Sequence, residues 1–276
     1  MNPDLPPTID PQAALRWQGI HYPGSPWLHE EVARRMQERL QWIRLQPRAW
    51  LHWEPLRGGL QAHALIAQRY PKSSCYVLEA SATRSGLATK EIAKPWWNAK
   101  RWTGPNTHYG PAPDASVDMV WANMALHMAP RPQELISSWQ RALAVDGFVM
   151  FSCLGPDTLR ELRTLYQDLG WPAPTHEFTD MHDWGDMLVA GGFAEPVMDM
   201  ERITLSFATP ERLIEELRPL GRNLHPARFA GLRTPRWRAR LLRALQEGVP
   251  RTADGQLLLT FEVIYGHAFK APARLP

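Results

Sequence analysis

The chain alternates short apolar runs with amphipathic helical patterns, and this alternation constrains the fold more strongly than any other feature. Mostly apolar runs of five or six residues lie at 49–53, 75–79, 117–122 and 148–153. Between them, apolar residues recur every three or four positions, as they do on one face of a helix. Strands that alternate with helices form βαβ units, in which a parallel sheet carries helices on both faces. We therefore predict an α/β fold built on a parallel sheet.

The second half of the chain adds a helical insertion before the last predicted strand. Two helical patterns, each preceded by a Thr-Pro pair, lie between late strands predicted at 197–207 and 257–269. At the other end, residues 1–24 are rich in proline and show no periodicity, which indicates an arm lying over the domain. We divide the chain into an N-terminal arm (1–24), a core (25–207 and 252–270) and a helical lid insertion (208–251).

Two local predictions concern the first helix and the longest loop. Ser25 stands before Pro26 and a run with helical periodicity, so we predict that Ser25 caps this helix. Residues 95–113 are rich in tryptophan, glycine, proline and asparagine, which is typical of a loop. Within that loop, the pair Trp96-Trp97 is a candidate for contact with a ligand or partner.

The composition suits one α/β domain with an insertion. The chain has 276 residues, of which 44% are apolar and 21% are charged. Its two cysteines, Cys75 and Cys153, lie inside predicted strands without the spacing of a metal site, which favours buried thiols in a reducing compartment. We find neither a secretory signal nor an apolar stretch of membrane-spanning length, so we expect a cytoplasmic protein with no membrane partner. The net charge of +3 is too modest to indicate nucleic-acid binding, and we expect a monomer.

Several segments together carry a resemblance to a known family. The most specific of them surrounds Gly155-Pro156-Asp157-Thr158-Leu159, and the likeness runs from about residue 10 to 270. On these segments the chain resembles the malonyl-acyl-carrier-protein O-methyltransferases of biotin synthesis, within the class I methyltransferases that use S-adenosylmethionine (SAM). The matching stretches are 32–45, 116–127, 151–162, 180–183, 192–199 and 260–268.

The resemblance implies a fold and a reaction. The fold is a Rossmann-like, seven-stranded, mostly parallel sheet with the last strand antiparallel, and SAM lies across the carboxyl ends of the first strands. The reaction is O-methylation of the free carboxylate of a malonyl thioester on an acyl carrier protein. An ionised carboxylate is already a nucleophile, so alignment and desolvation can supply much of the acceleration without a general base. We therefore name no catalytic residue and no metal site.

The family's cofactor residues follow its first two strands, and here they are only partly retained. The family ends its first strand in an acid and a Gly-x-Gly-x-Gly turn, whereas this chain places His52 at the acid's position, then Trp53, and keeps only Gly58 of the glycines. Glu79, followed by Ala80, ends the second strand, where the family's acid accepts hydrogen bonds from the ribose hydroxyls. The resemblance thus implies cofactor binding by these five residues.

Three further residues are implied near the reacting centre. Asn123 and His127 follow the strand at 117–122, where the family's Asn-x-Ala-Leu segment lines the methyl-transfer cleft. We assign Asn123 to the cofactor and His127 to the substrate, although a histidine beside an apolar run is also typical of a core. Tyr22 aligns with a tyrosine of the family's N-terminal arm and is expected to contact the substrate.

The altered turn leaves two functions open. One is an active SAM-dependent O-methyltransferase, and the other is a methyltransferase-fold protein that has lost SAM binding and acts as a binding or assembly partner. An open pocket beside Gly58 and Glu79 favours the first. A pocket filled by Trp53, Leu56 or Arg57 favours the second.

The lid insertion has a strongly basic sequence. Residues 202–251 carry eleven arginines against four glutamates. Because acyl carrier proteins are acidic, a basic lid is expected to steer and dock such a partner. The alternative is an ordinary solvated face of amphipathic helices.

Overall fold

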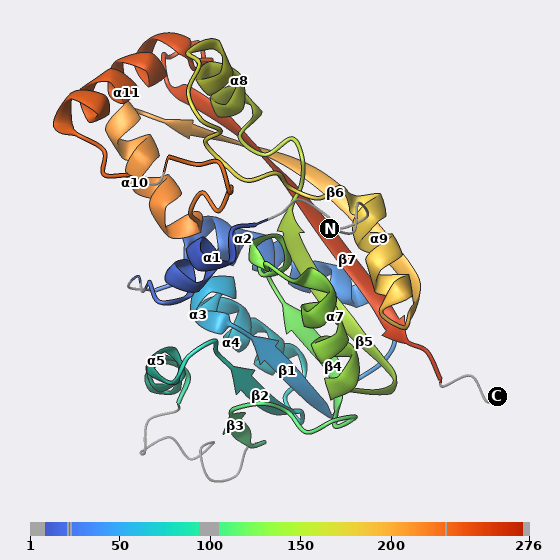
Figure 1. Ribbon diagram of the computed structural model, residues 1–276. Coiled ribbons are helices and arrows are strands. Elements are labelled where there is room, and N and C mark those ends of the chain that lie inside the picture. Colours follow the sequence, from blue (N-terminus) through green and yellow to red (C-terminus); the bar gives the residue numbers. More distant parts are fainter. Residues whose placement is uncertain (1–8, 21, 23, 94–104, 230, 273–276) are drawn as a thin grey trace.

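A seven-stranded mixed sheet forms the centre of the computed structural model, which describes residues 9–20, 22, 24–93, 105–229 and 231–272 (Figure 1). The strand order is β3-β2-β1-β4-β5-β7-β6. Strand β7 is antiparallel to both of its neighbours, and the other described pairs are parallel, so the last strand alone is reversed, as the resemblance implied. The strands are β1 (Ala49–Trp53), β2 (Ser74–Leu78), β3 (Thr107–Tyr109), β4 (Val117–Ala122), β5 (Leu143–Leu154), β6 (Phe193–Phe207) and β7 (Leu257–Lys270).

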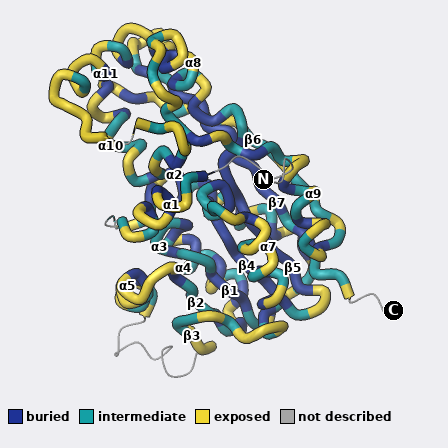
Figure 2. The backbone as a smooth tube through the Cα atoms, in the orientation of Figure 1, coloured by how far each residue is buried: buried dark blue, intermediate teal, exposed yellow. Residues whose placement is uncertain are grey.

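Helices cover both faces of this sheet. Side chains alternate along a strand, so Trp50 lies in the core on one face and Leu51 in the core on the other. Helix α2 packs on the first face through Met36, and α7 packs on the second through Trp139. Figure 2 shows the sheet as the most deeply buried layer. The described helices are α1 (Pro11–Gln18), α2 (Trp27–Arg39), α3 (Pro55–Gly58), α4 (Leu60–Arg69), α5 (Ala82–Ile92), α7 (Pro132–Ala142), α8 (Arg160–Asp168), α9 (Met181–Ala190), α10 (Pro210–Leu220) and α11 (Pro235–Gly248).

The long strands β6 and β7 carry a second group of helices. Figure 1 shows α8, α10 and α11 gathered at one end of these strands, far from β1, β2 and β3. Helices α10 and α11 begin as the Thr-Pro pairs predicted, because the side chains of Thr209 and Thr234 accept the backbone N–H groups of Arg212 and Trp237. None of the helices within the described ranges combines the length and the apolar character needed to cross a bilayer.

The N-terminal arm is more ordered than its sequence predicted. Residues 11–18 form α1, which begins at Asp10 because this carboxylate accepts the N–H groups of Gln12 and Ala13. The N–H of Asp10 donates to the carbonyl oxygen of Leu224, at 2.9 Å, so the arm is attached to the segment after α10. The prediction of an aperiodic arm was wrong here, because one buried face of two helical turns is too short to show a clear period.

Three other local predictions need correction. The loop predicted at 95–113 contains β3, a three-residue strand, while Trp96 and Trp97 lie outside the described residues. Strand β5 begins at Leu143 and not at Phe148, with a register shift opposite Val117 and Met119. Ser25 does not cap α2. Its hydroxyl oxygen instead accepts the N–H of Leu60 at the start of α4, at 2.9 Å.

Gly266, in the middle of β7, should be intolerant of any side chain. A Cβ atom there would lie 2.4 Å from Cζ of Phe151 on β5 and 2.8 Å from the sulfur of Met198 on β6. Because Phe151 is fully buried, Gly266→Ala should lower the free energy of unfolding by about 2 kcal/mol. Urea denaturation measures this change.

The matched control is Gly185→Ala on α9, where a Cβ atom would meet nothing within 4 Å. Alanine is the better helix former, so this variant should gain about 0.5–1 kcal/mol. Equal effects of the two substitutions would contradict the packing described for β7.

Candidate functional site

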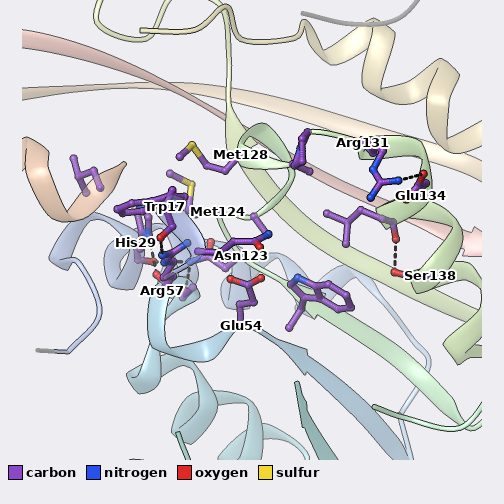
Figure 3. Close-up of a pocket in the computed structure, with 18 residues that line it drawn as sticks. Trp17, His29, Glu54, Arg57, Asn123, Met124, Met128, Arg131, Glu134 and Ser138 are labelled. Atoms are coloured by element: carbon purple, nitrogen blue, oxygen red, sulfur yellow. Dashed lines mark hydrogen bonds and ion pairs between the residues drawn. The ribbon is translucent and has the colours of Figure 1, made fainter. Parts of the chain in front are cut away.

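The site lies where the winding of the sheet reverses. The chain passes from β1 to β2 through α3 and α4 on one face, and from β4 to β5 through α7 on the other. The segments that leave the adjacent strands β1 and β4 therefore diverge and open a crevice at their carboxyl ends. A cavity of about 300 Å³ lies there, between the turn after β1, the segment after β4 and the arm (Figure 3).

Asn123 and Gly58 bring the two strand ends together. The amide nitrogen of Asn123 donates to the carbonyl oxygens of His29, at 2.8 Å, and of Gly58, while its amide oxygen accepts the hydroxyl of Ser152, at 2.5 Å. A Cβ atom on Gly58 would stand only 2.9 Å from the carbonyl oxygen of Asn123. This close approach explains why a glycine is retained at this one position of the altered turn.

The turn after β1 is built around Glu54. Its φ of 48° lies in the left-handed region, and its carbonyl oxygen accepts the N–H groups of Arg57 and Gly58, at 3.1 and 2.8 Å. Pro55 opens the short helix α3, where its missing N–H costs no hydrogen bond. The turn therefore folds into one helical turn, which places the side chains of Glu54 and Arg57 at the cavity wall (Figure 3).

Both carboxylate oxygens of Glu79, just past β2, lie against groups of the protein. Its Oε1 accepts the N–H of Leu56 at 2.8 Å, and its Oε2 lies 2.7 Å from the guanidinium of Arg84. Arg84 also lies 3.1 Å from the carboxylate of Glu54. The side chains of Glu79 and Arg84 are 0% and 1% exposed. Burial raises the pKa of Glu79 to about 7, and the charge of Arg84 opposes this rise.

The arm and α2 close a further side of the cavity. Nη2 of Arg57 donates to the carbonyl oxygens of Trp17 and Ile20, and its guanidinium carbon lies 3.9 Å above the centre of the Trp17 ring. Burial lowers the pKa of Arg57 to about 10, so this side chain stays charged at neutral pH. His29 on α2 donates from Nδ1 to the carbonyl oxygen of Arg57, at 2.8 Å.

Of the residues predicted for the cofactor, the structure brings three to the cavity: Trp53, Gly58 and Asn123. Glu79 lies nearby but does not line the cavity, because Arg84 and the backbone of Leu56 cover its carboxylate. The pocket is thus not fully open beside Glu79, as expected for an active methyltransferase. It is also not filled by Trp53, Leu56 or Arg57, as expected for a protein that has lost SAM binding.

The other predicted residues do not line the cavity. His52 is fully buried and stacks on His63 on the α4 side of the sheet, because strand alternation turns its side chain to the core. Ala80 is exposed on the surface. His127 is buried against Phe178, as the core alternative expected. The hydroxyl of Tyr22, on the arm, accepts a hydrogen bond from Arg222 at 2.5 Å.

The sequence did not reveal Arg84, His29 or Trp17 as residues of this region, and it pointed to Arg57 only as a side chain that could fill the pocket. Arg84 lies in the first turn of α5. A signal was present, since Arg84 follows Glu79 by five residues, which brings a cation close to the carboxylate at the end of β2. Trp17 belongs to α1, a helix that the sequence did not predict.

This sheet, with its reversed last strand and its crevice at the switch point, defines a class I methyltransferase fold. A model of the family described as "Methyltransferase domain" matches residues 57–151. The YcgJ protein from Bacillus subtilis is similar in structure, with a TM-score of 0.58, 13% identity and coverage of 88% of this chain and 99% of that chain. The [4+2]-cyclase SpnF is also similar, with a TM-score of 0.54, 14% identity and coverage of 96% and 97%.

Curated relatives identify the family within this class. The malonyl-[acyl-carrier protein] O-methyltransferase of Gallionella capsiferriformans is 36% identical over 92% of this chain and 88% of its own length. The protein of the same name from Halorhodospira halophila is 34% identical over 98% and 91%. The chain therefore belongs to the malonyl-[acyl-carrier protein] O-methyltransferase family, whose methyl donor is SAM.

The residues present fit this cofactor in chemistry, with one obstruction. The cavity beside Gly58 and Asn123 leaves room at the switch point, and Glu79 supplies a carboxylate at the end of β2 that can accept two hydroxyl protons. In the described conformation, however, one oxygen of that carboxylate accepts the N–H of Leu56, and the other lies in an ion pair with Arg84.

Buried histidines should make the protein less stable in weak acid. Burial lowers the pKa of both His29 and His176 to about 4, from an ordinary value of 6.5. Between these values the unfolded chain binds protons that the folded chain does not, so stability is lost as the pH falls from 6.5 toward 4. Each histidine should contribute a slope of up to about 1.4 kcal/mol per pH unit.

Two substitutions that keep a hydrogen-bond donor test this expectation. His29→Asn replaces an Nδ1 donor, and His176→Gln replaces the Nε2 that donates to the carbonyl oxygen of His127, at 2.9 Å. Urea denaturation at pH 7 and pH 5 should give a smaller loss of stability on acidification for each variant than for the wild type. The exposed His182→Gln is the control, and an unchanged loss in both buried variants would contradict the assignment.

Proposed function

We propose that this protein transfers the methyl group of SAM to the free carboxylate of a malonyl thioester on an acyl carrier protein, the reaction that the family resemblance assigns to biotin synthesis. The observation that carries the proposal is near-full-length similarity to relatives of that name, in a chain with a cavity at the switch point of the sheet. When bound, the cofactor supplies an electrophilic methyl group on a sulfonium sulfur. Gly58, Glu79 and Asn123 are the residues proposed to hold it.

The walls of the cavity suit an acceptor that carries negative charge. Trp17, Trp53 and Met124 line it with apolar surface, which favours exclusion of water from a carboxylate that must lose its hydration shell to react. Arg57 contributes a positive charge from the wall and favours an anionic acceptor over a neutral one. The proposed role of these groups is to position and desolvate the carboxylate, without removing a proton from it.

Substrate contacts are proposed at the arm. Tyr22 is held beside the cavity-lining Trp17, with ring centres 6.3 Å apart, and its hydroxyl is bonded to Arg222 of the insertion. We keep the proposal that Tyr22 contacts the substrate. The burial of His127 supports a role in the cavity's surroundings more than direct contact with an acceptor.

The acceptor's free carboxylate gives the sharpest test of the proposed reaction. With labelled SAM, the wild-type protein should methylate malonyl-acyl-carrier protein and leave acetyl-acyl-carrier protein unmodified, because the acetyl group has no carboxylate. Gly58→Val should reduce the rate at least tenfold, roughly the effect of displacing a positioning group, since its side chain would press on the carbonyl oxygen of Asn123. SAM binding without transfer to the malonyl form would refute the proposed acceptor.

We also propose that the carrier protein docks on the lid insertion. Helix α11 presents the exposed side chains of Arg236, Arg238, Arg240 and Arg243 against one acidic residue, Glu247. The insertion that contains α11 also reaches the cavity, because Leu220 of α10 is one of the lining residues. A carrier protein bound at α11 would thus lie on the segment that borders the proposed acceptor site.

Charge reversal on α11 should slow transfer only when the acceptor is protein-bound. The double variant Arg236→Glu/Arg243→Glu should lower kcat/KM for malonyl-acyl-carrier protein about tenfold at low salt, with a smaller difference at high salt. Transfer to malonyl-coenzyme A should not change. The matched control is Arg141→Glu on α7, an exposed arginine outside the insertion. An equal loss in this control would contradict docking at α11.

A further inference from the structure

Arg84 occupies the position beside Glu79 that a ribose would need. Its guanidinium lies between two carboxylates, 2.7 Å from Glu79 and 3.1 Å from Glu54, and its side chain is 1% exposed. The cavity beside Gly58 ends at Glu54 and Arg57 and does not reach Glu79. A cation is thus buried next to the one carboxylate that a cofactor bound across the strand ends would contact.

We propose that Arg84 is an internal competitor of the cofactor: it keeps Glu79 closed, and SAM reaches Glu79 only when the guanidinium moves away. This inference rests on the proposed function for the identity of the ligand. It adds a residue that sets the affinity of the site and is not itself a cofactor contact.

The competition follows from the small number of donors that Glu79 can accept in this position. Its Oε1 already has the N–H of Leu56, which belongs to the backbone of α3 and cannot be withdrawn without unfolding that turn. Its Oε2 faces Arg84. A ribose presents two neighbouring hydroxyls, so it would have to replace the guanidinium both as a donor and in the space beside the carboxylate.

The buried pair is suited to exchange of this kind. Removing a buried carboxylate's partner leaves it without compensation, whereas exchanging one donor for another keeps it satisfied. Burial already raises the pKa of Glu79 to about 7 with Arg84 in place. Oε2 of Glu79 has the charge of Arg84 beside it but accepts no hydrogen bond within the described structure, so a ligand hydroxyl could supply the donor that Arg84 does not.

The helix that carries Arg84 is thinly packed. Helix α5 buries only Arg84 and Ala88, and its Leu87 is 40% exposed. Figure 2 shows α5 as a largely exposed helix at the edge of the molecule. Segments with few buried apolar contacts open at a small fraction of the global unfolding free energy. Movement of the first turn of α5 would expose Glu79 without disturbing the sheet.

Calorimetric titration with S-adenosylhomocysteine tests the inference through affinity alone. Arg84→Met keeps the length of the side chain and removes its charge and its donors, so it should bind the probe at least tenfold more tightly than the wild type, as expected for removal of one internal ion-pair partner. Adding Glu79→Ala to Arg84→Met should abolish the gain. Lys90→Met, which removes an exposed cation from the same helix, should bind like the wild type.

A second variant keeps the test decisive if Arg84→Met does not fold. Glu54→Gln weakens only the outer contact of Arg84 and leaves both residues of the inner pair in place, so it should tighten binding by a smaller factor. Thermal unfolding establishes that each variant is folded. Equal or weaker binding by folded variants, or no binding by any of them, overturns the inference. Tighter binding without methyl transfer to malonyl-acyl-carrier protein would instead overturn the proposed function and leave the role of Arg84 standing.

Discussion

The site depends on one buried amide, that of Asn123. With 2% of its surface exposed, Asn123 joins α3, α2 and β5 through hydrogen bonds to Gly58, His29 and Ser152. An unpaired amide at this buried position would cost about 1–3 kcal/mol, and these three hydrogen bonds remove that cost. Because all three bonds come from one planar side chain, the relative positions of these elements are fixed together. The cavity is the space that remains beside this junction.

A second constraint acts on the other side of β1 and is electrostatic. Glu54, Glu79 and Arg84 bring two carboxylates to one guanidinium, with Glu79 and Arg84 fully buried and Glu54 partly exposed at the cavity. Such clusters seldom add stability, because the attraction mainly offsets the loss of hydration. Their effect is on specificity, since they fix which groups face one another. The left-handed φ of Glu54 is held in this way, as its carboxylate contacts Arg84 while its carbonyl oxygen begins α3. The turn thus replaces glycines by an ion pair and a short helix.

The spacing of apolar residues along the chain was enough to predict the sheet. The site could not be predicted in this way, because it depends on where each side chain points in the folded protein. The four early strands and the capped helices of the insertion each show a sequence pattern over five or more residues. In contrast, β3 has three residues and α1 only two turns, which is too short for a clear pattern. His52 shows the limit most clearly. Its place in the sequence matched the family's acid, yet strand alternation turns it into the core against His63. Arg84 was missed for another reason: Glu79 is near it in sequence, but Glu54 is 30 residues away, and the two carboxylates meet only where β1 and β2 end side by side.

The fold alone does not determine the reaction, since a methyltransferase and a cyclase can share it, and the cavity wall must therefore decide the acceptor. Here that wall is shared between two parts of the chain. The strands of the core provide Gly58 and Asn123, while the arm and α10 provide Trp17 and Leu220. The arm is in turn attached to the segment after α10, where Asp10 pairs with Arg228 at 2.5 Å. Any change in the position of the insertion must then also move the arm. An acceptor delivered at α11, as proposed, would meet a cavity whose wall includes Leu220 from the same insertion.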